Sequence, residues 1–186
     1  MLSLLKERDF LQNKKLKIAI GSDHVGYILK PAIEKYVEDL GYEVEDFGTN
    51  STERTDYPIY GEKVGRAVAS GECDLGITIC GTGIGIGIAA NKVKGTRVCM
   101  CSDCYSAKLS RMHNNSNILS FGSRVVGQEL AKMIIKNWLE ARYIGGRHER
   151  RVEEIAAIES DDKNEFIKLI KSKNFDGKEK YEDQPL

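Results

Sequence analysis

Residues 75–92 read LGITICGTGIGIGIAANK and combine three signals in a short span. The apolar run 75–79 is typical of a buried strand, and Cys80 follows at its end. Four alternating glycines then lead into a helix-like segment at 88–90. In open α/β sheets the ligand crevice lies at the carboxyl ends of the strands, and N–H groups at a helix N-terminus can surround an anion. The span therefore predicts either a catalytic thiol beside an oxyanion cradle or a glycine-rich turn with a buried cysteine.

Composition excludes several classes of protein. The chain has 186 residues, enough for one domain with a substantial core, and its 28 basic residues balance its 28 acidic ones. No overall charge favours nucleic acid or a membrane surface. Residues 1–17 lack the apolar core of a signal peptide, and no apolar run could span a bilayer. The odd number of cysteines, five, suggests thiols in a reducing compartment. We expect a cytoplasmic protein without nucleic-acid or membrane partners.

Strand and helix patterns alternate along the chain. Strands are predicted at 16–21, 42–47, 75–80, 97–101 and 118–121. Apolar residues at helical spacing predict helices within 28–40, 60–68, 88–90, 103–112, 130–139 and 149–158. Pro31 fits the first of these helices only in its opening turn. The alternation predicts an α/β fold, a three-layer α/β/α sandwich around a Rossmann-like five-stranded parallel sheet.

The two ends of the chain differ from its centre. Residues 1–15 read as an N-terminal extension, and 16–159 as the main domain. Residues 160–186 are highly charged and keep one apolar stripe, Phe166, Ile167, Leu169 and Ile170. This pattern predicts a partly helical C-terminal extension that packs either on the core or on a neighbouring subunit.

Polar residues follow the first predicted strand, at Asp23 and His24. Because the carboxyl ends of parallel strands share one edge of the sheet, both residues should lie near the Cys80 loop. A carboxylate and an imidazole there suit the binding of a hydroxyl group and a phosphate. The alternative is that Asp23 caps a helix N-terminus and His24 has no role in binding.

Three further groups could take part in binding or catalysis but have simpler explanations. His113 and Asn114 follow the fourth helical segment, where an imidazole could open a sugar ring or be an ordinary surface histidine. Arg147 and Arg151 are spaced i, i+4 on one helix face, which suits a phosphate dianion or a solvated basic surface. Arg124, just after the fifth strand, could add a third guanidinium.

Two other chemistries remain open from the residues alone. The segment 85–90 fits a degenerate dinucleotide fingerprint, with Asp103 near the end of the next strand, which would indicate a dinucleotide-dependent oxidoreductase. Cys101 and Cys104 form a C-x-x-C pattern after a strand, where redox dithiols occur. Zinc binding by Cys99, Cys101 and Cys104 lacks a fourth ligand at the usual spacing, so these cysteines are better explained as small buried side chains.

Taken together, these segments resemble the type-B ribose-5-phosphate isomerase family, which also includes allose-6-phosphate and galactose-6-phosphate isomerases. The likeness covers residues 16–159 in one register. It is carried by seven segments: GSDHVG at 21–26, ERTDYP at 53–58, ICGTGIG at 79–85, AANK at 89–92, LSRMHN at 109–114, FGSRVVG at 121–127 and GGRHERRV at 145–152. Several long segments in order are far more specific than any one of them.

The resemblance implies catalytic roles. Cys80 would be the base that moves a proton between carbons 2 and 1 of the open-chain sugar. His113 would help to open the furanose ring with Asp23, and Thr82 would relay the hydroxyl proton. Proton transfer of this kind requires no metal and no redox cofactor. The family's sites form between two subunits, so the resemblance implies a homodimer or tetramer.

The resemblance also implies a set of substrate-binding residues. These are Asp23, His24, Tyr57, Gly81, Thr82, Gly83, Ile84, Gly85, Asn114, Arg124, Arg147 and Arg151. Among them His24 and the three arginines would hold the phosphate, Tyr57 would line the pocket, and backbone N–H groups of 81–85 would stabilise the enediolate oxygen.

Two departures within the family bear on the substrate. Some members use a glutamate as the base where this chain has Ile86, so the cysteine-base branch applies. The galactose-6-phosphate branch often lacks the equivalent of His113, which this chain has. The resemblance therefore favours ribose 5-phosphate and the pentose phosphate pathway, with allose 6-phosphate or galactose 6-phosphate as the alternative substrates. The long C-terminal extension keeps the galactose-6-phosphate alternative open.

Overall fold

The computed structural model describes residues 15–160 and residue 167 of the chain. The chain forms two compact units, Met1–Ile144 and Gly145–Leu186. The strands of the first unit are β1 (Lys17–Ser22), β2 (Glu43–Asp46), β3 (Leu75–Cys80), β4 (Val98–Met100) and β5 (Ile118–Gly122). Its helices are η1 (a 3₁₀ turn, Gly26–Ile28), α2 (Lys30–Asp39), α3 (Tyr57–Ser70), α4 (Ile84–Asn91), α5 (Cys104–Asn114) and α6 (Gln128–Glu140). The second unit contributes α7 (Arg147–Glu159).

The five strands form one parallel sheet in the order β2-β1-β3-β5-β4. Every residue of β3 is buried, as expected for a central strand covered on both faces, and this explains its continuous apolar sequence. The chain leaves β1 for the edge strand β2 and then crosses back to β3. The direction of winding therefore reverses between β1 and β3, and the carboxyl ends of these strands are where such folds bind ligands.

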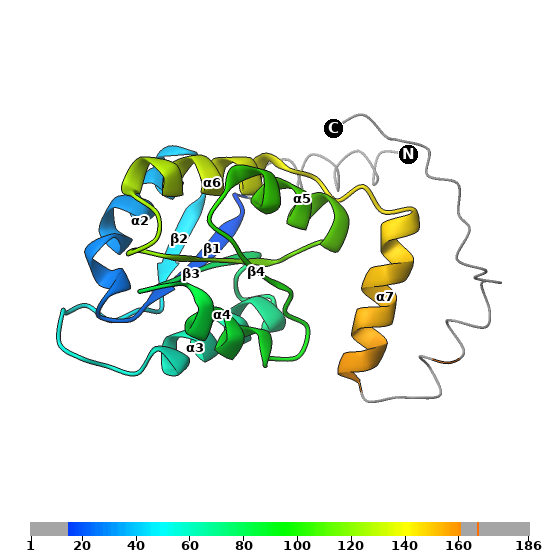
Figure 1. Cartoon of the computed structure of the whole chain (residues 1–186), viewed down its shortest axis with the longest axis horizontal. Coiled ribbons are helices and arrows are strands. Elements are labelled where there is room, and N and C mark those ends of the chain that lie inside the picture. The colour runs from blue at the N-terminus through cyan, green and yellow to red at the C-terminus, as the bar shows by residue number, and fades with distance from the viewer. Residues whose placement is uncertain (1–14, 161–166, 168–186) are drawn as a thin grey trace, which may run out of the picture. The chain divides into compact units, whose positions relative to one another are not determined.

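Helices cover both faces of the sheet, which gives the three layers seen in Figure 1. On one face α2, α5 and α6 enclose the larger core, in which Trp138 is fully buried. On the other face α3 and α4 enclose a smaller core. Alternate residues of β1 divide between them, with Ile18 and Ile20 in the first and Ala19 in the second. The predicted α/β sandwich with a five-stranded parallel sheet is confirmed.

Two predicted boundaries were wrong. The helix expected at 88–90 begins at Ile84, because Gly85 and Gly87 adopt helical conformation and lie inside α4. His113 and Asn114, expected after a helix, lie in the last turn of α5, which Asn115 ends in a left-handed conformation at φ 48°. Pro31 lies in the first turn of α2, as predicted.

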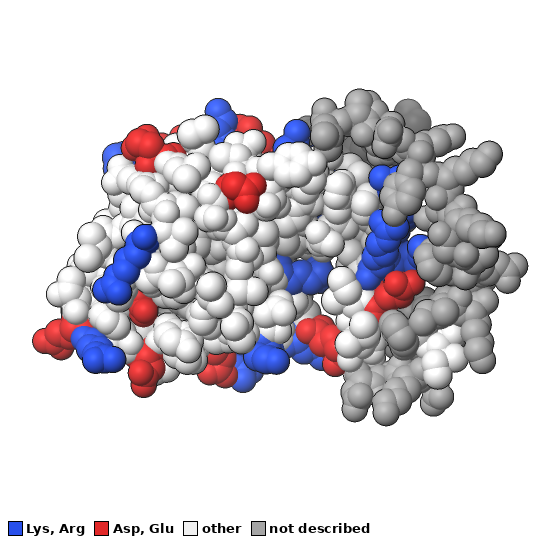
Figure 2. Space-filling view, viewed as in Figure 1, with Lys and Arg blue, Asp and Glu red and all other residues white. Residues whose placement is uncertain are grey.

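The predicted apolar stripe of the C-terminal extension falls outside the described residues except for Ile167, and the division at residues 15 and 159 stays a prediction. No helix within residues 15–160 and 167 is long and apolar enough to cross a membrane. Figure 2 shows basic and acidic side chains interspersed on the visible face of the first unit, in keeping with the balanced composition.

Candidate active site

Three loops meet at the carboxyl edge of the sheet, after β1, β3 and β5. The backbone N–H of Asp23 donates to the carbonyl of Ile79 at 3.3 Å. The N–H of Ser123 donates to Cys80 O at 2.9 Å, and that of Arg124 to Gly81 O at 3.1 Å. These bonds bring the predicted residues Asp23, Cys80, Gly81 and Arg124 into one site, as the shared strand edge suggested.

The thiol of Cys80 lies at the N-terminus of α4 and is only 5% exposed. Its Sγ accepts a hydrogen bond from the N–H of Gly83 at 3.1 Å. Gly83 has φ 78°, and a Cβ there would lie 2.5 Å from the backbone of Phe121. The hydroxyl of Ser120, on the neighbouring strand β5, also donates to Gly83 O. The sulfur therefore lies at a helix N-terminus with a backbone N–H directed at it, an arrangement that suits an anionic group.

The glycine loop supplies further donors beside this thiol. Thr82 is exposed, and its Oγ1 accepts from the N–H of Ile84 at 3.4 Å. Gly85 and Ile86 occupy the first turn of α4, where N–H groups have no helical acceptor. The Tyr57 ring packs against Gly85 so closely that a Cβ on Gly85 would lie 2.6 Å from it. The loop therefore supplies a hydroxyl and backbone N–H groups next to Cys80, and α3 places the Tyr57 ring against Gly85.

Asp23 and His24 are both held by backbone groups. One carboxylate oxygen of Asp23 accepts from the N–H groups of Val25 at 2.9 Å and Gly26 at 2.8 Å, which fixes the backbone at the start of η1, whose N-cap residue is Val25 rather than Asp23. The Nδ1 of His24 accepts from the N–H of Thr55 at 3.3 Å. In the neutral imidazole this bond assigns the proton to Nε2, which remains available to donate.

A cavity of about 420 Å³ adjoins these loops. Its lining includes the imidazole of His24, the guanidinium-bearing side chain of Arg124, and Gly127 and Gln128 at the N-terminus of α6. An imidazole, a guanidinium and the positive end of a helix dipole make this cavity suitable for a phosphate.

Sequence reasoning missed Thr52, Thr55, Ser123 and Gln128 at this site. Thr52, Ser123 and Gln128 line the cavity, and the hydroxyl of Ser123 donates to Val25 O at 3.1 Å and to Cys80 O at 3.2 Å. Thr55 and Ser123 fall within 53–58 and 121–127, two of the segments that carry the family resemblance, so their position in the sequence could have marked them as site residues. Nothing in the sequence marks Thr52 or Gln128.

His113 and Asn114 lie at the opposite edge of the sheet from Cys80. They end α5 just before β5, whose first residue Ile118 pairs with Gly76 near the start of β3. The five residues of β5, at 3.3 Å each, separate the edges by about 16 Å. In a single copy of the first unit, His113 therefore does not lie near Cys80, the predicted base.

Arg147 and Arg151 lie one turn apart on α7, as their spacing predicted. They belong to the second unit, which is described separately from the loops around Cys80. Their predicted phosphate contacts stay a prediction.

The other cysteines form a different environment. All five cysteines are free thiols. Cys101 hydrogen-bonds to the sulfur of Cys99, and this lowers the pKa of the Cys99 thiol to about 7, while the same contact raises the pKa of Cys101. Cys99, Cys101 and Cys104 are partly exposed, so the expectation that they are buried was wrong.

The glycines of the dinucleotide-like segment have packing roles. A Cβ on Gly85 would strike Tyr57, and one on Gly87 would lie 2.6 Å from Met100. Both lie inside α4 rather than in the turn after β3, so they do not form the phosphate-binding turn of a dinucleotide fold.

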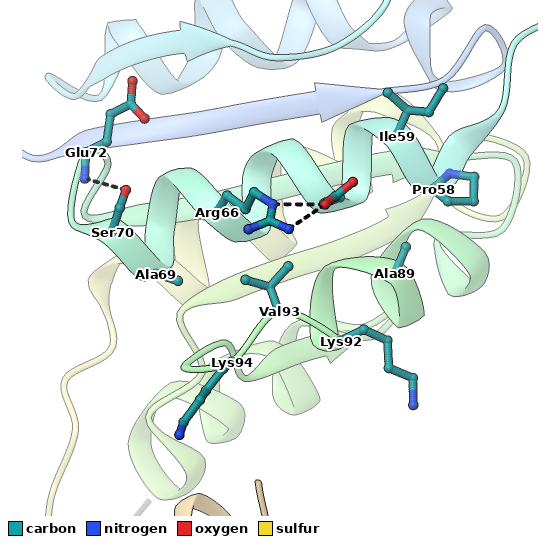
Figure 3. Close-up of a pocket in the computed structure, with 11 residues that line it drawn as sticks. Pro58, Ile59, Arg66, Ala69, Ser70, Glu72, Ala89, Lys92, Val93 and Lys94 are labelled. Atoms are coloured by element: carbon teal, nitrogen blue, oxygen red, sulfur yellow. Dashed lines mark hydrogen bonds and ion pairs between the residues drawn. The ribbon is translucent and has the colours of Figure 1, made fainter. Parts of the chain in front are cut away.

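A larger groove, of about 780 Å³, lies between α3 and α4 on the outer surface (Figure 3). None of the predicted site residues lines it. Arg66 pairs with Glu62 on the same helix at 2.8 Å, and Lys92 and Lys94 point away from α3 in Figure 3. Within residues 15–160 and 167, no group of three or more His, Cys, Asp or Glu side chains is placed to hold a metal ion.

Comparison with known proteins identifies the relatives of this chain. The Ribose/Galactose Isomerase family model matches residues 18–155. "Ribose-5-phosphate isomerase B" of Escherichia coli (strain K12) is 62% identical over 143 residues, which cover 77% of this chain and 96% of that protein. "D-erythrulose-4-phosphate isomerase" of Pectobacterium atrosepticum is 41% identical over 151 residues, covering 81% of this chain and 99% of the relative.

A solved structure agrees with this likeness. The Clostridium thermocellum Ribose-5-Phosphate Isomerase B structure superposes with a TM-score of 0.77 at 56% identity, covering 78% of this chain and 98% of that one. The family match spans most of the chain, and it includes the thiol loop and the cavity residues built up above. The chain therefore belongs to the ribose/galactose isomerase family.

Proposed function

We propose that this protein interconverts ribose 5-phosphate and ribulose 5-phosphate in the cytoplasm, as a step of the pentose phosphate pathway. One observation carries the proposal: a buried thiol with a backbone donor lies beside a cavity that offers an imidazole, a guanidinium and a helix N-terminus. This arrangement suits a substrate with an anionic end and an acidic carbon. The high identity to a protein named ribose-5-phosphate isomerase B supports the choice of sugar.

The proposed chemistry is a proton transfer through an enediolate. The phosphate binds in the cavity, where His24 Nε2–H and Arg124 donate to its oxygens. The Cys80 thiolate removes the proton from carbon 2 of the open-chain aldose and returns it to carbon 1. Thr82 carries the hydroxyl proton from the oxygen on carbon 2 to the oxygen on carbon 1. One carbon is oxidised and its neighbour reduced, so atoms and electrons balance within the substrate.

The glycine loop stabilises the intermediate. Negative charge that develops on the enediolate oxygen lies within reach of N–H groups in the segment 81–85 and at the start of α4. The N–H of Gly83 already donates to the sulfur of Cys80, and the N–H of Ile84 donates to Thr82 Oγ1. Gly81, Thr82 and Gly85 therefore remain as the proposed donors, and one such donor typically contributes about 10²–10³-fold in rate.

We further propose that the active form is a homodimer or tetramer with sites between subunits. His113 and Asn114 lie an entire strand length from Cys80 in one copy, so a second copy would supply them. Ile84 and Ile88, one turn apart on α4 beside the thiol loop, are 55% and 47% exposed. An exposed apolar face next to the site suits contact with such a copy. Arg147 and Arg151 would complete the phosphate contacts.

The decisive experiment is to incubate the purified full chain with ribose 5-phosphate, EDTA and no nucleotide, and to follow ribulose 5-phosphate. Rapid conversion is expected. Parallel reactions with allose 6-phosphate, galactose 6-phosphate and D-erythrulose 4-phosphate test the substrate. Conversion of one of these but not of ribose 5-phosphate would correct the sugar. If no sugar phosphate is converted, the isomerase proposal is wrong.

A further inference from the structure

Lys30 is a buried cation at a helix position that does not favour a positive charge. It is the first residue of α2, and its side chain is 2% exposed. Lysine is almost never fully buried without a partner. A positive charge at a helix N-terminus also opposes the helix dipole. Both effects disfavour lysine at this position, so the reason for it must lie in what its ammonium contacts.

The hydrogen bonds of the Lys30 ammonium go to one segment, residues 46–50, at the end of β2 and directly after it. Its Nζ forms an ion pair with Asp46 and donates to Thr49 O at 2.9 Å and to Asn50 Oδ1 at 3.2 Å. These three bonds use all the donors of an ammonium group. Glu34 lies 4.0 Å away and the Tyr27 ring centre 5.6 Å away, which completes the enclosure of the charge. Lys30 therefore ties α2 to the end of β2 and to Thr49 and Asn50 in the loop that leads to α3.

The fixed loop is packed against the end of β1. Thr49 N donates to Ser22 O at 2.9 Å, and the second carboxylate oxygen of Asp46 accepts from Gly48 N at 2.8 Å. A Cβ on Gly48 would lie only 2.6 Å from the backbone nitrogen of Ser22. The lysine thus holds this loop against the residue that directly precedes Asp23 and His24.

The same loop then reaches the phosphate end of the cavity. Two further bonds order the next residues: Ser51 N–H donates to Thr49 Oγ1 at 3.4 Å, and Glu53 N–H donates to Ser51 Oγ at 3.2 Å. Thr52 lines the cavity with His24, and Thr55 N donates to His24 Nδ1. Lys30 itself is not part of the cavity lining. Its ion pair therefore connects to His24 through the loop, while the neighbouring Leu29 lines the cavity directly.

We propose that Lys30 is a positioning residue that holds the loop 46–55 so that His24 presents Nε2–H to the phosphate. This inference rests on the proposed function, in which His24 binds that phosphate. Without the ammonium, the loop loses three anchoring bonds, and the ring of His24 loses the fixed donor that sets its tautomer. Binding of the anionic end of the substrate then weakens, while the proton transfer at Cys80 is left intact.

The test compares Lys30→Met with Lys35→Met in the full chain. Lys35 lies on the same helix, is exposed, and makes one ion pair with Asp39. We expect Lys30→Met to raise both KM for ribose 5-phosphate and the inhibition constant of inorganic phosphate about fivefold or more, with kcat within about twofold, because the lost interaction is one of binding. Lys35→Met should leave all three constants unchanged. A fall in kcat at constant KM, which a partly unfolded preparation would give, overturns the proposal.

A second readout does not depend on turnover. The chain has three histidines, so the ¹⁵N resonances of His24 can be assigned with a His24→Gln variant. We expect a single tautomer with the proton on Nε2 in the wild type and in Lys35→Met, and mixed tautomers in Lys30→Met. An unchanged tautomer in folded Lys30→Met overturns the proposal. If the wild type converts no ribose 5-phosphate, the proposed function is wrong. The role of Lys30 is still decided in that case, by adding inorganic phosphate and following the ¹⁵N resonances of His24 in the wild type and in Lys30→Met.

If Lys30→Met does not fold, Asp46→Asn gives the same comparison. Asp46 is one-third exposed, and an asparagine can still accept from Gly48 N while losing the charge that pairs with Lys30. We expect a smaller rise in KM and in the phosphate inhibition constant, in the same direction. A folded Asp46→Asn variant with unchanged constants and an unchanged His24 tautomer contradicts the proposal.

Discussion

The carboxyl and amino edges of the central sheet differ in what their polar groups contact. At the carboxyl edge, loops after β1, β3 and β5 are joined by backbone bonds around the Cys80 thiol and a cavity. At the amino edge, Arg97 and Arg111 donate to backbone carbonyls of the turn at 115–116, and Trp138 Nε1 donates to Ser116 Oγ at 2.8 Å. One edge leaves polar groups to face a ligand, whereas the other uses them to close a turn.

If His113 takes part in the reaction as proposed, this difference leaves the site incomplete in one copy. Residues that follow a strand reach the carboxyl edge, and residues that follow a helix reach the amino edge. Cys80, the last residue of β3, lies at the carboxyl edge, and His113, in the last turn of α5, lies at the amino edge. A mechanism that uses both residues therefore needs two copies arranged so that one copy's amino edge meets the other's carboxyl edge.

The largest expected effect comes from removing the thiol at the carboxyl edge. Cys80→Ala should lower kcat about 10²–10⁴-fold, because the proton transfer loses its base, while substrate binding is largely kept. Initial rates of ribulose 5-phosphate formation measure the change. Cys104→Ala, which removes a partly exposed thiol elsewhere, should leave the rate unaltered. Full activity in Cys80→Ala would show that another group is the base.

Mixing two inactive variants tests whether the two edges cooperate between copies. Cys80→Ala and His113→Ala should each be nearly inactive alone. In a statistical mixture half of the dimers pair one of each, and one of their two sites then has both native residues, so about one quarter of the wild-type activity should return. Activity is measured after joint unfolding and refolding. If the mixture stays as inactive as its components, both residues act from the same copy.

A smaller effect is expected from the glycine that supports the thiol. Gly83→Ala places a Cβ 2.5 Å from the backbone of Phe121 at φ 78°. The left-handed strain should cost about 1–2 kcal/mol of unfolding free energy, and the steric overlap about 1–3 kcal/mol more. Gly71→Ala is the matched control, because Gly71 has φ 79° and open space around its Cβ position. Chemical denaturation should give only the strain cost for Gly71→Ala. Equal losses in the two variants would contradict the close packing of the thiol loop.

The smallest expected effect concerns a second thiol, that of Cys99 on β4. The contact with Cys101 lowers the Cys99 pKa to about 7, so its thiolate is present above that pH and is lost as the pH falls. Alkylation by iodoacetamide should slow about fivefold between pH 7 and pH 6, since the thiolate is the nucleophile. Burial raises the pKa of Cys73 to about 11, so Cys73 should stay unlabelled at both values. Peptide mass spectrometry separates the two, and a Cys99 midpoint near 9 would refute the contact.

The sheet and the thiol loop could be predicted because their signals are local. The apolar run of β3 and the strand-end positions of Asp23 and Cys80 follow from periodicity and from the rule of parallel strands. The start of α4 could not be predicted in the same way. Glycine normally weakens a helix, but here Tyr57 and Met100 pack so closely on α4 that only glycine fits.

The role of Lys30 was hidden for a different reason. A lysine in an amphipathic helix normally lies on the side that faces solvent. Lys30 is buried instead because its ammonium bonds to residues that lie 16–20 positions further along the chain. The distance between His113 and Cys80 was also hidden, because it follows from the direction of α5 rather than from any residue. Contacts between distant segments, not local propensity, decide both cases.

The acidic strand β2 restricts how copies of this chain can associate. Within the described residues β2 and β4 are the two outer strands of the sheet, and β2 carries Glu43, Glu45 and Asp46. Two such strands brought side by side would place carboxylates of like charge together, and the ion pairs of Lys17 with Glu45 and of Lys30 with Asp46 compensate them only in part. A continuous intermolecular sheet through β2 is therefore disfavoured. The exposed isoleucines of α4, which border the proposed site, offer an apolar surface for association instead.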